Sequence, residues 1–273
     1  MLTKPYSGPL RAVILDWVGT VVDFGSRAPA DAYIVAFRSA GVAISVDEAR
    51  LHVGLPKWDH IRAIGQLPEV RQRWTDVHGR PFDDADAAAL YEKFLSVSID
   101  TVGGHAGLIP GTLETVEELR RRGLRIGSTT GYTRAIMDAL MPEAARRGYR
   151  PDCVVCAGEV PDARPAPLAC LQAMILLNVW PAAACVKVDD TVTGIEEGLN
   201  AGMWTVAVAL TGNEMGLSEA ELSALPPAEF KERKAAVYER FQQAGAHYVI
   251  DGIRDLIPVL EDIERRMVLG AAP

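Results

Sequence analysis

The stretch AVILDWVGTVVD, residues 12–23, places a carboxylate, Asp16, directly after four apolar residues. A short apolar run that ends in an acid predicts a buried strand whose carboxyl end presents that acid. An acid that acts in proton chemistry usually has a partner nearby, but two residues further on the chain has Val18. The stretch therefore predicts a reactive carboxylate that has no acid partner in its own loop.

Length and composition set the broad class of protein. The chain has 273 residues, 49% hydrophobic and 23% charged, which is typical of a globular protein of one or two domains. The net charge of −8, without a local basic cluster, argues against nucleic acid as a partner. No apolar run reaches the ~18 residues of a membrane helix, and Asp16 interrupts the first one. We therefore expect a cytoplasmic protein without a membrane partner.

Helix signals follow one another from residue 28 to residue 100 without a convincing strand. They include the capping-box pattern at Ser45 and Glu48, and Pro56, which starts a helix that ends at Gly65. The other expected helices in this region span residues 30–40, 68–77 and 84–99. This part of the chain is predicted to be an all-helical module.

Helices and short apolar strands alternate after residue 110. We expect strands at residues 11–15, 124–128, 153–156, 184–188, 204–209 and 248–250, and helices at 112–122, 133–147, 167–177, 195–201, 218–223 and 227–244. This alternation predicts the α/β class, with a Rossmann-like parallel sheet covered by helices on both faces. The first strand belongs to that sheet. Residues 1–26 and 101–273 are therefore expected to form the core, and residues 27–100 a helical insertion.

Reactive side chains follow several of these strands at their carboxyl ends, where open α/β sheets bind ligands. Asp16 follows the first strand, GSTTGYT spans residues 127–133, Arg164 lies on a loop, and Asp189 and Asp190 end a later strand. Acids that converge at one edge repel one another unless a cation separates them, and oxygen ligands favour Mg²⁺. A metal, a carboxylate nucleophile and an oxyanion pocket are the parts that phosphoryl transfer requires. The helical insertion is expected to cover this edge as a lid.

Four segments carry a resemblance to a known superfamily. In this order, DWVGT, GSTTGYT, the loop of Arg164 and DDTVTGIEEG resemble the four motifs of the haloacid dehalogenase-like superfamily. The resemblance covers nearly the whole chain. It implies a Rossmann-like core, Mg²⁺ and an aspartyl-phosphate intermediate, with the helical insertion as the cap domain. Most phosphatases of that superfamily carry a second Asp where this chain has Val18.

The helical insertion contains a candidate replacement for the missing acid, in HVGLPKWDHIRAIG (residues 52–65). Pro56 places Lys57 in the first turn of a helix, where the positive end of the helix dipole disfavours an ammonium. His60, three residues further, lies on the same helix face. Taken alone, Lys57 is a solvated surface lysine. With Val18 excluding acid catalysis, we interpret it as a neutral amine that forms a Schiff base with a carbonyl.

This combination resembles the phosphonatase branch of the superfamily, which cleaves the carbon–phosphorus bond of phosphonoacetaldehyde to acetaldehyde and phosphate in 2-aminoethylphosphonate degradation. The resemblance implies a small phosphonate substrate and a homodimer joined through the caps. It implies these roles: nucleophile, Asp16; imine-forming amine, Lys57; proton transfer, His60; phosphoryl binding, Thr130, Gly131 and Arg164; substrate pocket, Gly54 and Tyr132; Mg²⁺ binding, Asp16, the carbonyl of Val18, Asp190 and Asp189.

Three positions depart from the pattern of that branch. Val18 stands where Ala is expected, Val53 stands where Met is common, and Gly194 replaces an acid of the metal motif. We expect Asp189, directly before Asp190, to compensate for the acid that is missing at position 194.

Two other functions remain as alternatives. The first is a phosphomonoester phosphatase or phosphomutase of the same superfamily. Val18 argues against it, because valine cannot protonate the leaving oxygen of a phosphate ester. A non-catalytic binding module is the other, since Asp190 can cap a helix and Thr130 can occupy a turn. The joint presence of Asp16, Lys57, Thr130, Arg164 and Asp190 argues against the second alternative.

Overall fold

The computed structural model describes residues 6–51 and 55–273. In this part of the chain, six strands form one sheet in the order β3-β2-β1-β4-β5-β6, and every pair of neighbours is parallel. The strands are β1 (Ala12–Leu15), β2 (Arg125–Thr133), β3 (Cys153–Ala157), β4 (Cys185–Asp189), β5 (Trp204–Val208) and β6 (Tyr248–Ile250). The prediction of a parallel α/β sheet is therefore confirmed.

The helices, in chain order, include three short 3₁₀ segments (η). They are α1 (Arg27–Ser39), α2 (Val46–Arg50), α3 (Lys57–Gly65), α4 (Pro68–His78), α5 (Asp84–Thr101), η1 (Val102–His105), α6 (Thr112–Arg121), α7 (Arg134–Arg146), α8 (Leu168–Leu177), η2 (Ala182–Ala184), α9 (Val192–Asn200), α10 (Glu219–Ala224), α11 (Pro227–Gln243), η3 (Ile253–Asp255) and α12 (Leu256–Val268). Of these, α12 was not predicted, although its apolar residues recur at helical spacing. None of the described helices is long and apolar enough to cross a membrane.

The central strand β1 is completely buried because helices cover both faces of the sheet. Its residues point alternately to the two faces. Val13 and Leu15 pack into the larger apolar cluster, whereas Ala12 and Ile14 pack against α8 in a second one. A strand buried on both faces reads as a continuous apolar run, as AVIL does.

The register of β1 aligns three chain segments at the carboxyl edge of the sheet. Leu15 lies opposite Ser128 of β2 and Val188 of β4. The next residue of each strand therefore reaches the edge at the same level, and the Asp16 N–H donates to the carbonyl of Val188 at 3.0 Å. This alignment is what brings residues so distant in the sequence into one site.

Strand β2 is longer than the sequence indicated. We expected it to end at Ser128, but extended backbone continues to Thr133, with a shift of register against β3 between Thr129 and Thr133. Hydroxyl side chains suggested a loop, yet threonine and tyrosine are good strand residues. The Ser128 hydroxyl also donates to the carbonyl of Leu15 at 2.7 Å, which ties this segment to β1.

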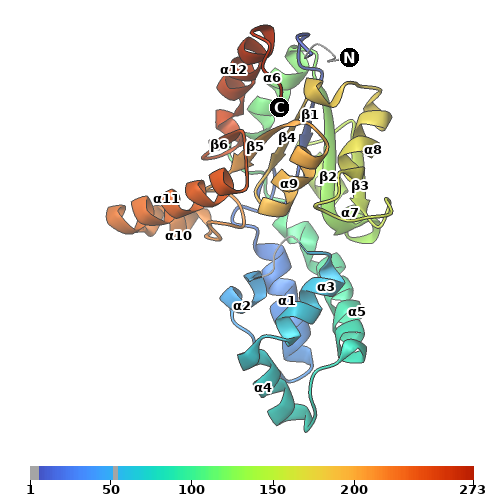
Figure 1. Cartoon of the computed structure of the whole chain (residues 1–273). Helices are drawn as coiled ribbons and strands as arrows, with labels where there is room; N and C mark the ends of the chain where they lie inside the picture. Colours follow the sequence, from blue (N-terminus) through green and yellow to red (C-terminus); the bar gives the residue numbers. More distant parts are fainter. Residues whose placement is uncertain (1–5, 52–54) are drawn as a thin grey trace.

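The helices α1 to α5, which we call the cap, form a separate layer below the carboxyl edge of the sheet (Figure 1). No strand interrupts this stretch in its described residues, as predicted. Aromatic rings fill its interior, with Tyr33 stacked on Phe94 at 4.5 Å between ring centroids. The predicted capping box is confirmed, because the Glu48 N–H donates to Ser45 Oγ at 3.1 Å. The exact domain boundaries stay a prediction.

The segment between β5 and β6, residues 209–247, contains the two predicted helices α10 and α11, which extend to one side of the core (Figure 1). Its first part lies against the cap. Arg27 of α1 forms an ion pair with Glu221 of α10 at 2.8 Å. The cap is therefore bound to the core through this segment as well as through its two chain connections.

Candidate active site

Asp16 lies at the centre of the carboxyl edge and is 6% exposed. Its Oδ1 accepts a hydrogen bond from Nη2 of Arg164 at 2.8 Å. Burial and the nearby charge of Asp189 raise the pKa of Asp16 to about 6, while Arg164 and Lys187 oppose that shift. The carboxylate is thus buried, oriented and paired with one cation.

Arg164 contacts three carboxylates at once. Besides Asp16, its guanidinium lies 3.3 Å from Asp189 and 3.0 Å from Glu197. Nη2 also donates to Thr129 Oγ1 at 2.9 Å. The predicted convergence of Arg164 on Asp16 is therefore observed, and all three of its nitrogens already face acceptors of the protein.

Asp16, Asp189 and Asp190 form a cluster whose carboxylate oxygens lie within 4.8 Å of one another. Asp190 accepts from the N–H of Asn213 at 2.8 Å and from the hydroxyl of Thr20 at 3.2 Å. Burial, followed by the charges of Asp16 and Asp189, raises the pKa of Asp190 well above its usual range. Such mutual repulsion disappears when a cation lies between the acids.

The carboxylate of Asp189 fills the space that a side chain at position 194 would need. A Cβ atom built on Gly194 would overlap that carboxylate. Asp189 is held there by Lys187 at 2.9 Å and by the N–H and hydroxyl of Thr191 at 3.0 and 2.8 Å. The acid that the sequence lacks at position 194 is thus matched by an acid that reaches the same place from the neighbouring strand.

Lys57 and Asp16 line the same cavity, whose volume is about 60 Å³. Val18, Thr130, Gly131, Tyr132 and Arg164 are among its other lining residues. The ammonium nitrogen of Lys57 lies 5.6 Å from the ring centre of Tyr132. We call this space the reaction cavity, since it brings the cap amine and the core carboxylate together.

Lys57 is the first residue of α3, as the position of Pro56 predicted. Burial lowers its pKa from 10.5 to about 8, with Asp16 and Asp190 opposing the shift and Arg164 adding to it. A lysine whose pKa approaches neutrality is a competent nucleophile toward carbonyls. The sequence argument from the helix N-terminus gave the same direction.

Thr130 and Gly131, near the end of β2, face Lys57 from the core. The Thr130 hydroxyl accepts from the N–H of Tyr132 at 3.1 Å, so its own hydrogen is free to point toward the cavity. Gly131 lies beside the Lys57 side chain, about 3.9 Å from where its Cβ would be. Both residues therefore line the reaction cavity from the core side, and their role in phosphoryl binding stays a prediction.

Two predicted site residues are placed differently or not at all. His60 is completely buried inside the cap, where its ring lies 4.4 Å from that of Tyr33, and it does not line the reaction cavity. Its role in proton transfer stays a prediction. Gly54, together with the neighbouring Val53, lies outside the described residues. The carbonyl of Val18 as a metal ligand is likewise untested.

Three residues of the site escaped the sequence analysis: Thr129, Lys187 and Glu197. Lys187 is completely buried in β4, where it donates to Thr129 at 2.6 Å and contacts Glu197 at 3.0 Å. A charged residue inside the apolar run ACVKV was a visible signal, because an unpaired buried lysine is very costly. Nothing in the sequence indicated that Glu197 belongs to the site, apart from its position on the helix that follows Asp189 and Asp190.

The buried charges around the nucleophile do not balance within the described residues. Asp16, Asp189, Asp190 and Glu197 are carboxylates, whereas Arg164 and Lys187 are the paired cations. With Lys57 counted as its neutral amine, the excess is two negative charges when all the other groups are ionised, which a divalent cation matches. Three oxygen donors in close proximity are also the ligand type that Mg²⁺ prefers.

The family model of the haloacid dehalogenase-like hydrolases matches residues 10–202, which span Asp16, Arg164 and the acidic cluster. The chain belongs to this family. Its members are hydrolases, and the resemblance seen in the four motifs is thereby confirmed.

Individual relatives place the chain more narrowly among the phosphonoacetaldehyde hydrolases. A phosphonoacetaldehyde hydrolase-like protein of Syntrophobacter fumaroxidans is 46% identical over 271 residues, 99% of this chain and 98% of the relative. A phosphonoacetaldehyde hydrolase of Paraburkholderia xenovorans is 46% identical over 264 residues, 97% of this chain and 99% of the relative. The crystal structure of a similar hydrolase-like protein from Oleispira antarctica has a TM-score of 0.96 and 37% identity, covering 100% of this chain and 99% of that one. The chain is therefore an enzyme of this hydrolase family.

Proposed function

We propose that the protein hydrolyses the carbon–phosphorus bond of phosphonoacetaldehyde to acetaldehyde and phosphate, as a step of 2-aminoethylphosphonate degradation. The observation that carries the proposal is the joint placement of the Lys57 amine and the Asp16 carboxylate in one cavity, with Val18 at its wall in place of an acid. The names of relatives that are 44–46% identical over nearly the full chain support the same substrate.

Lys57 would act first. Its neutral amine adds to the aldehyde carbon, the adduct takes up one proton and loses water, and a protonated imine results. The burial of Lys57 favours the neutral form of its amine. His60, one helical turn further along α3, would assist these proton transfers.

Asp16 would then attack phosphorus. As the oxygen–phosphorus bond forms, the carbon–phosphorus bond breaks and its electron pair moves through carbon to the iminium nitrogen, giving a neutral enamine. The enamine takes up a proton at carbon, and water releases acetaldehyde and the free lysine. A second water hydrolyses the aspartyl phosphate to phosphate and Asp16. No acid is needed at position 18, because the iminium group accepts the electrons.

The remaining residues would hold the phosphonyl group. Thr130, Gly131 and Arg164 would donate to its oxygens. The guanidinium of Arg164 contacts Thr129 and Glu197, and Lys187 contacts both of these residues in turn. Mg²⁺, held by Asp16, Asp190 and Asp189 with the carbonyl of Val18, would neutralise the repulsion between the carboxylates and the phosphonate. A homodimer joined through the caps is part of the same proposal.

The decisive experiment incubates the purified protein with phosphonoacetaldehyde and Mg²⁺ and measures both products. We expect acetaldehyde and inorganic phosphate in equal amounts. Release of phosphate from phosphate monoesters, with no acetaldehyde from phosphonoacetaldehyde, would support the alternative of a phosphatase. Size-exclusion chromatography with light scattering tests the dimer.

A further inference from the structure

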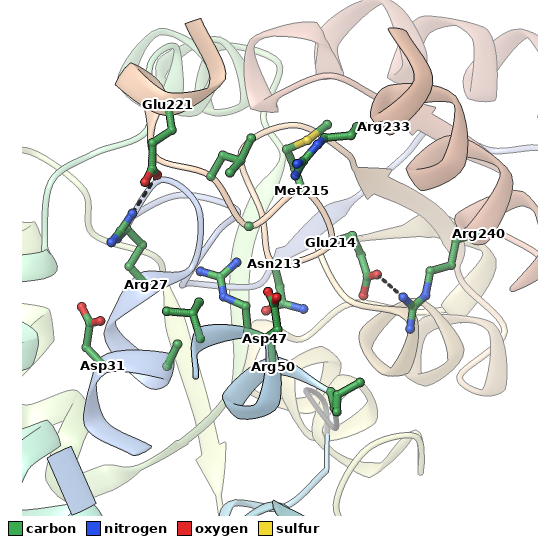
Figure 2. A pocket seen from close by; sticks show the side chains of 15 residues that line it. Arg27, Asp31, Asp47, Arg50, Asn213, Glu214, Met215, Glu221, Arg233 and Arg240 are labelled. Atoms are coloured by element: carbon green, nitrogen blue, oxygen red, sulfur yellow. Dashed lines mark hydrogen bonds and ion pairs between the residues drawn. The ribbon is translucent and has the colours of Figure 1, made fainter. Parts of the chain in front are cut away.

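A second and larger cavity of about 580 Å³ lies between the cap and the core, bounded by α1 and α2 on one side and by residues 213–221 and α11 on the other (Figure 2). It shares three lining residues, Ala30, Arg50 and Asn213, with the reaction cavity. We call it the outer cleft. Arg50 therefore lies at the border between the two spaces.

Arg50, the last residue of α2, crosses from the cap to the core. Its Nη2 donates to the carbonyl of Gly25 at 2.9 Å. Its Nη1 lies directly over the backbone of Gly216, where any Cβ atom would overlap it. Gly216 has a φ of 68°, so glycine suits this position by conformation as well as by space. The guanidinium is thus held at the junction of the two cavities by backbone groups.

The other arginines of the outer cleft have carboxylate partners, and Arg50 does not. Arg27 pairs with Glu221 at 2.8 Å and Arg240 with Glu214 at 2.9 Å, at opposite ends of the cleft with Arg50 between them (Figure 2). No carboxylate in residues 6–51 and 55–273 lies within ion-pair distance of Arg50, and its buried Nε–H has no acceptor there. A half-buried guanidinium with unused donors is costly unless an anion binds to it.

The reaction cavity itself offers few unused cationic donors. The guanidinium of Arg164 already contacts Asp16, Asp189 and Glu197 with its three nitrogens. A phosphonate dianion that binds only there must displace carboxylates from Arg164. Arg50 lines the same cavity, and its buried Nε–H has no acceptor among the described residues. A guanidinium binds two oxygens of a phosphonyl group at once.

We propose that Arg50 is a substrate-binding residue that takes up the phosphonate dianion from the outer cleft and holds it in the reaction cavity. The proposal rests on the proposed function for the identity of the substrate, but the anion that Arg50 recognises is any small phosphonate or phosphate dianion. It also explains the outer cleft as the access route. Arg50 belongs to the cap, whereas Asp16 belongs to the core. An anion bound by Arg50 in the reaction cavity therefore favours the arrangement in which the cap lies against the core.

The test compares R50M and R50K with R233M as the matched control. Arg233 lines the same outer cleft but pairs with Glu229 at 2.7 Å and does not line the reaction cavity. Titration calorimetry with inorganic phosphate in the presence of Mg²⁺ should show about 10- to 100-fold weaker binding for R50M, the usual loss for a charge-assisted hydrogen bond in a half-buried site. KM for phosphonoacetaldehyde should rise by a similar factor. R50K should lie in between, and R233M within about twofold of wild type.

Two outcomes would overturn the proposal. One is unchanged phosphate affinity in R50M. The other is a fall in kcat while KM and phosphate affinity stay at wild-type values, which would make Arg50 a residue that only positions the cap. If R50M does not fold, R50K carries the same comparison, because it keeps the charge and loses the two-oxygen contact. The titration uses phosphate and not an aldehyde, so it decides the role of Arg50 even if phosphonoacetaldehyde is not the substrate.

Discussion

The Asp189 carboxylate lies in the space directly above the Cα of Gly194, so that only glycine fits at position 194. The two positions are therefore coupled. Asp189 ends β4, and its carboxylate occupies the space that a side chain on α9 at position 194 would fill. The same carboxylate contacts Lys187 and Arg164, which ties this pair to the cations of the site.

This coupling predicts that G194A is strongly disruptive although it adds a single methyl group. The new Cβ must displace Asp189 and break its contacts, and overpacking of this kind costs about 1–3 kcal/mol. Thermal denaturation should show a lower Tm, and activity should fall as well because Asp189 loses its contacts with Lys187 and Arg164.

The double variant D189G/G194D provides the control, since it moves the acid to the helix and frees its former place. We expect it to be more stable than either single variant, D189G or G194D. A double variant whose loss of stability is the sum of the two single losses would show that the positions are independent.

Removal of the metal should abolish activity, and D190N should reduce both activity and affinity for Mg²⁺. Asp190 is held by Asn213 and Thr20 within the acidic cluster, and an amide supplies a weaker ligand than a carboxylate. The measurement is the Mg²⁺ dependence of turnover after treatment with EDTA. Full activity after chelation would exclude the metal.

D189N is the matched comparison for the metal prediction. Asp189 is already bound by Lys187 and Thr191, so we expect a smaller effect on Mg²⁺ affinity than in D190N. A larger effect in D189N would make Asp189 the principal ligand, in keeping with its place opposite Gly194.

V18D should not improve the phosphonate reaction. Val18 lines the reaction cavity, and a carboxylate there adds a charge close to Asp16 and the acidic cluster, where anions already repel one another. Because the iminium group removes the need for an acid, we expect carbon–phosphorus cleavage to fall by about 10-fold or more, the size of a ~1.4 kcal/mol penalty. Parallel assays with phosphonoacetaldehyde and p-nitrophenyl phosphate measure it. Wild-type rates on phosphonoacetaldehyde would refute this explanation of Val18, for which V18A serves as the neutral control.

Much of this site could be predicted because its residues follow strands. Residues that follow neighbouring parallel strands lie at the same edge of the sheet. Asp16, Arg164 and Asp190 could therefore be predicted to lie together from the order of their motifs. Contacts across helices and between cap and core carry no such register. Glu197 and Arg50 therefore escaped prediction, and His60 proved to point into the cap interior. Lys57 was predicted by a chemical argument: because Val18 cannot act as an acid, another group must help the leaving group depart.

The last prediction concerns the pH dependence that Lys57 imposes. Only the neutral amine attacks the aldehyde, and burial lowers the Lys57 pKa to about 8. At pH 7 roughly one enzyme molecule in ten would then carry the free amine, against about one in three thousand for an ordinary lysine. The rate of imine formation should therefore rise with pH, tenfold per unit well below pH 8, and level off above it. A bound divalent cation near Asp16 would shift this rise to lower pH, since it cancels the charges that oppose the lowered pKa.

Borohydride trapping measures this step directly. Borohydride added together with phosphonoacetaldehyde should inactivate the enzyme irreversibly and add mass to the peptide that contains Lys57, and the trapping rate should follow the pH profile above. K57R, which keeps the positive charge but does not lose its proton, should show neither trapping nor release of acetaldehyde. It should still bind inorganic phosphate, because Thr130 and Arg164 lie on the core. Label on a different lysine, or a trapping rate that keeps rising through pH ~10.5 as an unperturbed lysine would make it do, would refute the assignment of Lys57.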